Sequence, residues 1–121
     1  MTLEECYSAL DGNYEDVVAR LRSEKLVQKF ILRFLDDQSY ELFCTSIEEK
    51  NYKEAFRAAH TIKGICQNLG FTRLLKSSSD MSDALRNGWT PKVDDIIKQF
   101  AADYQLTKEA IEIFQKEYGG Q

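Results

Sequence analysis

The residue with the clearest chemical potential is His60, the only histidine of the chain. A single imidazole is too little for a histidine-rich metal site, and no obvious partners for a nucleophilic triad accompany it. It is enough to carry a phosphoryl group on a ring nitrogen. Lys63 and Gly64 follow it by three and four residues and lie beside it on a helix, which favours that chemistry.

The segment around His60 has the period of an amphipathic helix. With Ala55 at zero and about 100° per residue, one apolar stripe lies within about 40° of Ala55. The stripe consists of Ala55, Ala59, Ile62, Cys66 and Leu69. His60 lies at about 140° on this wheel, flanked by a cation (Lys63), an amide (Gln67) and Gly64. The sequence therefore predicts that the imidazole lies outside the buried face.

Each neighbour has a physical reason to be there. Glycine inside a helix costs about 0.5–1 kcal/mol relative to alanine, so Gly64 suggests a steric requirement, such as room for a docking protein over His60. Lys63 can offset the charge of an incoming phosphoryl group, and Gln67 can donate an amide hydrogen to its oxygens. The residues alone leave one alternative open, a surface histidine beside an incidental lysine, because exposed histidines are ordinary.

The chain is expected to be helical from end to end, since no stretch alternates like a strand. The predicted helices are a short piece before Gly12, residues 14 to 21, a segment containing Leu26, Phe30 and Phe34, a segment after a break at 36 to 38, the histidine helix up to Gly70, a helix ending at Asn87-Gly88, and a last one running nearly to the C-terminus. The expected N-caps are Ser23, Asp37, Asn51, Thr72 and Thr90. Asn51 would form a variant capping box with Glu54, and Thr90 is followed by Pro91 at the first helical position. The apolar stripe of the last helix comprises Val93, Ile97, Phe100, Tyr104, Ile111, Phe114 and Tyr118.

Helices joined by short connections pack as antiparallel neighbours. We therefore expect an all-α fold, an antiparallel up-down-up-down four-helix bundle built from about Gln38 to Tyr118, with the additional short N-terminal helices covering one end. A length of 121 residues predicts a single domain, residues 1–121.

Composition excludes several functions. The net charge of -4 argues against nucleic acid as the main partner, because phosphate-backbone binding requires an excess of Lys and Arg. No run approaches a membrane span, and the first residues do not resemble a signal peptide, so we expect a cytoplasmic protein without a membrane partner. The cysteines (Cys6, Cys44, Cys66) form no metal or disulfide pattern and are interpreted as reduced thiols used as small apolar residues.

The run from Ala59 to Gly70 resembles the signature of histidine-containing phosphotransfer (HPt) domains of two-component phosphorelays. The matching features are the A-H-x-[LI]-K-G core around His60 and the Leu-Gly pair at its end. The turn before Tyr52 and the helix after Gly70 also look like those of the family, so the likeness covers roughly residues 38 to 86. Two positions depart from the family pattern. Ile65 stands where the family usually has a small residue, and Ser82 stands where an acidic residue is frequent. Neither change affects the phosphorylation motif.

The resemblance implies a phosphorelay intermediate and not a kinase. His60 would be the phosphoacceptor, assisted by Lys63 and Gln67, and Phe56, Arg57 and Gly64 would contact the partner. The implied partners are a receiver domain of a response regulator and a histidine kinase. No cofactor is expected in this domain, because the chain has no Gly-rich phosphate loop, and Mg²⁺ would come from the receiver domain.

Two alternatives of other classes stay open. One is a helical adaptor or interaction module that is not phosphorylated. The other is the phosphoacceptor module of a larger chemotaxis-type histidine kinase, whose ATP-binding domain would belong to a longer gene product. The cognate partners, the signal, the direction of phosphoryl flow and the oligomeric state do not follow from the sequence.

Overall fold

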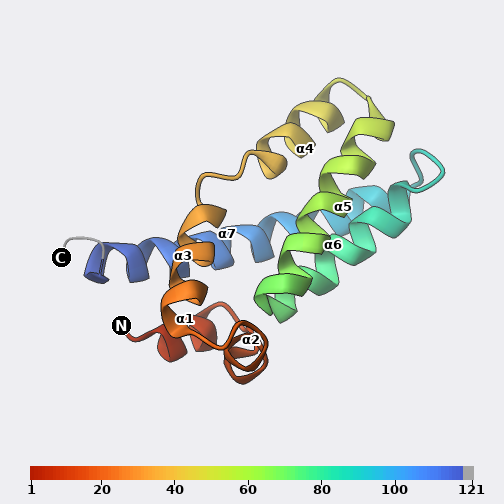
Figure 1. Cartoon of the computed structure of the whole chain (residues 1–121). Coiled ribbons are helices and arrows are strands. Elements are labelled where there is room, and N and C mark those ends of the chain that lie inside the picture. Colours follow the sequence, from red (N-terminus) through yellow and green to blue (C-terminus); the bar gives the residue numbers. More distant parts are fainter. Residues whose placement is uncertain (119–121) are drawn as a thin grey trace.

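The computed structural model describes residues 1–118, which form seven helices and no strand. Their bounds are α1 Leu3–Ala9, α2 Tyr14–Leu21, α3 Glu24–Phe34, α4 Ser39–Glu48, α5 Tyr52–Leu69, α6 Thr72–Leu85 and α7 Lys92–Tyr118. In Figure 1, α4, α5, α6 and the first half of α7 run side by side, while α1, α2 and α3 gather at one end around the rest of α7. The predicted all-α four-helix bundle with short N-terminal helices is confirmed.

Aromatic side chains close the bundle between its first and last helices. Tyr40 of α4 stacks on Tyr104 of α7 with ring centroids 3.9 Å apart. Phe43 meets Phe100 edge to face at 5.0 Å, one turn later in α4 and one turn earlier in α7. Such pairs add stabilisation beyond the area they bury. The other predicted apolar residues of α7 line the same side, except that the side chain of Tyr118 lies outside the described residues.

The helix boundaries follow local capping at some positions. Ser23 caps α3 as predicted, accepting a hydrogen bond from the Leu26 amide at 3.2 Å. Asn51 accepts one from the Glu54 amide at 3.3 Å, but the carboxylate of Glu54 pairs with Arg57, so the variant capping box is only half formed. The predicted N-cap at Asp37 is wrong by one position, because Gln38 is the N-cap residue of α4. Asp37 precedes it, and its Oδ1 accepts a hydrogen bond from the Ser39 amide at 2.8 Å.

Two further predicted caps, at Thr72 and Thr90, are wrong. Helix α6 begins at Thr72 itself, after Phe71, and the Leu75 amide, which a cap at Thr72 could have bound, donates to the carbonyl oxygen of Phe71 at 2.8 Å. The amide of Arg73 donates to the carbonyl oxygen of Asp11 from the N-terminal segment. The buried hydroxyl of Thr90 has no hydrogen-bond partner in the described part of the chain. Its carbonyl oxygen accepts from the Val93 amide instead, and the helix begins at Lys92, one residue later than predicted.

The short N-terminal helices are fastened to the C-terminal end of α5 by a close backbone approach. Gly70 ends that helix in a left-handed conformation (φ 70°), and its carbonyl oxygen accepts a hydrogen bond from the Asn13 amide at 2.8 Å. A Cβ on Gly12 would lie 2.7 Å from the same Gly70 oxygen, so only glycine fits there. The hydroxyl of Tyr7 donates to the Leu69 carbonyl at 2.6 Å. This end of α5 is therefore held rigidly.

The three cysteines are free thiols in this structure. Cys6 and Cys66 lie in the core, Cys44 is half-buried, and none forms a disulfide. Burial raises the pKa of the Cys66 thiol to about 12, because the thiolate would lose its hydration. Among residues 1–118, no helix is long and apolar enough to cross a membrane.

Candidate functional site

Helix α5 has one buried face and one open face. The predicted stripe is confirmed, since each of its residues is buried: Ala55, Ala59, Ile62, Cys66 and Leu69. Ala58 is buried as well, where α5 packs against its neighbours α4 and α6. His60 is exposed on the other side of the helix, as its position on the wheel predicted.

The imidazole of His60 lies against an aromatic ring. The ring of Phe56, one turn earlier, lies nearly parallel to it, with centroids 5.9 Å apart and an interplanar angle of 17°. Within residues 1–118 the imidazole neither donates nor accepts a hydrogen bond. Both ring nitrogens are therefore free to react with or bind a group arriving from outside.

Lys63 and Gln67 lie beside the histidine without binding partners of their own. Lys63 is half-buried and forms no ion pair within the described chain, and Gln67 is exposed and forms no hydrogen bond there. Arg57 is also exposed, but its guanidinium already pairs with Glu54 at 2.7 Å. The structure thus brings the predicted polar residues onto one face and leaves Lys63 and Gln67 available for a ligand.

Gly64 has open space around its Cα. A Cβ built at this position meets nothing within 4 Å, so no neighbouring helix requires the absence of a side chain. Packing therefore does not explain why glycine is kept inside this helix at a cost in stability.

The open face of α5 is positively charged. On the helical wheel, Lys53, Arg57 and Lys63 all lie within about 60° of His60. The single carboxylate of α5, that of Glu54, lies about 120° away and pairs with Arg57, so Lys53 and Lys63 supply the excess charge. The chain as a whole carries a net charge of -4. The local excess of cations makes this surface attractive to an acidic partner or a phosphoryl group.

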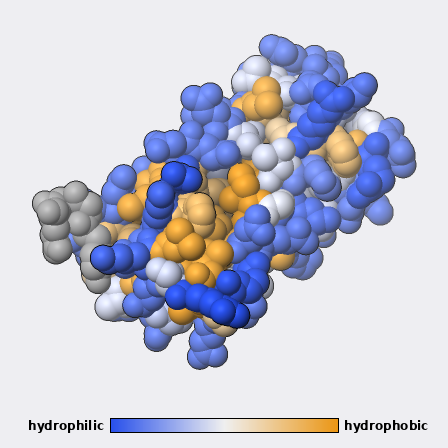
Figure 2. Space-filling model, in the orientation of Figure 1, coloured by the Kyte–Doolittle hydropathy of each residue, from blue (hydrophilic) through white to orange (hydrophobic). Residues whose placement is uncertain are grey.

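Two features of this surface were missed by sequence reasoning. Arg86 reaches over from the end of α6, and its guanidinium carbon lies 5.5 Å from the centroid of the Phe56 ring. An apolar groove of about 540 Å³ also opens between α2, α3 and α5. It is lined by Arg20, Leu21, Phe30, Arg33, Phe34, Asp37, Ile65, Asn68 and Leu69. Figure 2 shows apolar side chains gathered between α3 and α5 on this face.

The groove opens further along α5 than the histidine, and one of its lining residues, Asn68, shares a helix ridge with His60. His60, Gly64 and Asn68 succeed one another at intervals of four residues and form one ridge of the helix. Asn68 lies on the groove, about 12 Å along the helix axis from His60. Only the packing of α2 and α3 against α5 reveals the groove, so no local pattern could have indicated it.

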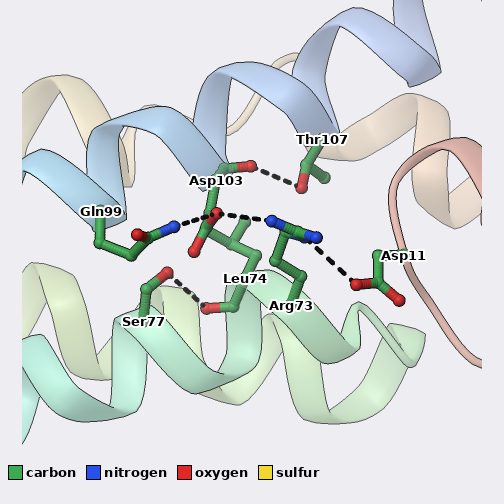
Figure 3. A network of polar contacts seen from close by, with 7 residues as sticks. All are labelled: Asp11, Arg73, Leu74, Ser77, Gln99, Asp103 and Thr107. Atoms are coloured by element: carbon green, nitrogen blue, oxygen red, sulfur yellow. Dashed lines mark hydrogen bonds and ion pairs between the residues drawn. The ribbon is translucent and has the colours of Figure 1, made fainter.

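A second polar region lies between α6 and α7 and has a different character. Figure 3 shows Asp103 at its centre, with Arg73, Gln99 and Thr107 around it. The carboxylate of Asp103 is 5% exposed, accepts a hydrogen bond from Gln99 at 2.8 Å and lies 3.8 Å from Arg73. Arg73 also pairs with Asp11 at 3.2 Å, and Thr107 donates to the main-chain oxygen of Asp103. These contacts join α6, α7 and the segment after α1.

No group of three or more His, Cys, Asp or Glu side chains that could hold a metal ion occurs in the described residues. The Hpt domain family model matches residues 2–113 of the chain. No curated protein and no solved structure matches it.

Proposed function

We propose that this chain, which belongs to the Hpt domain family, is a phosphorelay intermediate that carries a phosphoryl group on His60. Hpt domains are phosphotransfer modules of two-component signalling. In our proposal the group arrives from the aspartyl phosphate of a receiver domain or from a histidine kinase, and leaves for a response regulator. The observation that carries the proposal is the exposed imidazole, stacked on Phe56 but free of hydrogen bonds within residues 1–118.

The transfer would be an in-line displacement at phosphorus. The lone pair of Nε2 attacks while Nδ1 keeps its proton, so an N–P bond forms as the O–P bond of the acyl phosphate breaks. The receiver aspartate leaves as a carboxylate, and the product is a phosphoimidazole. Nucleophilic catalysis of this kind needs an accessible nitrogen with an unoccupied lone pair, which the exposure of His60 supports.

Two neighbours have the chemistry to stabilise the transferred group. The ammonium of Lys63, which has no ion pair among the described residues, can bind a phosphoryl oxygen and offset its charge. The amide of Gln67 can donate a hydrogen bond to the same oxygens. We assign both residues this role, with Lys53 and Arg57 adding a positive potential that attracts an acidic receiver site.

The docking surface in our proposal centres on Phe56, Arg57 and Gly64. The open space at Gly64 would leave room for a partner protein to approach His60. We extend this surface along the α5 ridge into the apolar groove, because an apolar anchor next to a polar centre is the usual composition of a protein interface. ATP would be bound by the kinase, and the receiver domain would supply Mg²⁺.

The direct test is incubation of the chain with phosphorylated receiver domains from the same genome. We expect acid-labile, base-stable label on the wild-type chain and none on His60→Gln. A matched control is Lys76→Gln, on the exposed side of α6, which should accept phosphate as the wild type does. If no receiver or kinase labels the wild type, the adaptor alternative is supported and the proposal fails.

A further inference from the structure

His60 lacks the contact that usually orients a functional imidazole. In most such sites one ring nitrogen donates to a carboxylate or a carbonyl group, and this bond fixes the ring. No such bond occurs among residues 1–118. Rotation about the last side-chain bond of histidine has broad minima, so another contact must restrict the ring. Among residues 1–118, the aromatic ring that lies against the imidazole is that of Phe56.

The ring of Phe56 is itself held from two sides. It is half-buried and packs against the core, which restricts one part of the ring. The guanidinium of Arg86 lies over it at 5.5 Å, within the range of a cation–π contact. Arg86 is the C-cap residue of α6, so its place relative to α5 depends on the packing of these two helices.

Arg86 is in turn oriented by its own helix. Its Nη2 donates to Oδ1 of Asp83 at 3.1 Å, one turn earlier. A cation at the C-terminal end of a helix also interacts favourably with the helix dipole. A guanidinium offers a flat, permanently charged surface to an aromatic ring, which an ammonium does not match.

We infer that Arg86 is a positioning residue: it holds the Phe56 ring, and through that ring it orients the imidazole of His60 for phosphoryl transfer. The inference rests on the proposed function. It assigns a part in the reaction to a residue of α6, 26 positions along the chain from the histidine. Arg86 acts here on the nucleophile and not on the phosphoryl group.

A double-mutant cycle in the full chain tests this route. We expect Arg86→Gln to slow phosphoryl transfer from a labelled receiver about threefold to tenfold, because the imidazole samples more orientations. Phe56→Leu should have a similar or larger effect. In the Phe56→Leu background, Arg86→Gln should change the rate by less than about twofold, since its route to the histidine is already removed. Arg86→Lys should restore part of the rate.

A second readout does not depend on transfer. Because His60 is the only histidine, its imidazole protons give a single set of NMR signals. The stacked Phe56 ring shifts these signals, and Phe56→Leu should abolish the shift. Arg86→Gln should reduce it while leaving the unfolding temperature near that of the wild type. Lys76→Gln, which also removes a paired cation from α6, should leave both the shift and the rate unchanged.

Three outcomes would overturn the inference. The first is an Arg86→Gln variant with the wild-type shift and rate. The second is an equal loss of rate in the wild-type and Phe56→Leu backgrounds, which would place Arg86 in direct contact with the phosphoryl group or the partner. The third is a loss of the shift caused by general unfolding. If the wild-type chain accepts no phosphate, the proposed function fails, and the imidazole shift alone decides whether Arg86 positions His60.

Discussion

The polar network around Asp103 and the polar surface around His60 differ in how far their hydrogen-bonding groups are satisfied. Asp103 is nearly buried and bound by Gln99 and Arg73. His60 and Lys63, in contrast, have no hydrogen bond or ion pair among residues 1–118. Buried polar groups require partners, whereas exposed ones can remain free for a ligand.

Each region includes an arginine of α6, one near each end of the helix. Arg73 pairs with Asp11 and Asp103 and so joins three segments of the fold. Arg86 lies over an aromatic ring next to an unpaired imidazole. In our proposal the first region stabilises the fold, whereas the second serves recognition and chemistry. Substitutions in the two regions should therefore have effects of different kinds.

The largest expected effect is that of His60→Gln. We expect it to abolish phosphoryl acceptance completely, because glutamine has no ring nitrogen to attack phosphorus. The free energy of unfolding should change by less than about 0.5 kcal/mol, since the side chain is exposed. Phosphorylation assays and denaturant unfolding measure the two quantities. Undiminished acid-labile label on this variant would contradict a phosphoacceptor role for His60.

Asp103→Ala should show the opposite behaviour. Removing this carboxylate leaves Arg73 and Gln99 without a shared acceptor, so we expect a loss of about 1–3 kcal/mol in the free energy of unfolding. The transfer rate of the folded protein should stay near that of the wild type. Asp80→Ala, which removes an exposed pair with Lys76, is the control and should cost about 0.5 kcal/mol or less. If Asp103→Ala slowed phosphoryl transfer without lowering the free energy of unfolding, the two regions could not be assigned separate roles.

Gly64→Gln distinguishes a role of Gly64 in helix packing from a role in the docking of a partner over His60. The free space at Gly64 admits a side chain, and replacing a helical glycine should leave Tm equal or higher. Transfer should slow about tenfold or more, equivalent to about 1.4 kcal/mol in the barrier, because the side chain obstructs the partner. Gly64→Ala should stabilise the helix similarly with a smaller kinetic effect. Normal transfer by the glutamine variant would refute the steric argument.

Lys63→Ala is expected to have the smallest effect. Loss of the ammonium should slow transfer, or shorten the lifetime of the phosphorylated form, by about threefold to tenfold, because one charge-assisted contact is removed. Unfolding should be unaffected, since Lys63 has no ion pair within the described residues. Rates and lifetime equal to those of the wild type would exclude a role in charge stabilisation.

Much of the fold was predictable because helix periodicity is local. The stripe from Ala55 to Leu69 predicted both the buried face of α5 and the exposure of His60, and the structure confirms both. The resemblance around the histidine covered roughly residues 38 to 86, whereas the family match covers 2–113 and includes the N-terminal helices. The caps at Thr72 and Thr90 were wrong because main-chain oxygens, those of Phe71 and of Thr90 itself, accept from the amides that these side chains were expected to bind.

The sequence by itself determined the helices, the side of α5 that faces the core and the residue available for chemistry, because each depends on spacing within one segment. Only the tertiary structure decided what surrounds that residue. The contact of Arg86 with Phe56 and the apolar groove beside Asn68 both require helices from separate segments to pack together. So does the approach of Gly12 to Gly70, where a Cβ would collide with a backbone oxygen. Such contacts join residues far apart in the chain, and a helical period carries no information about them.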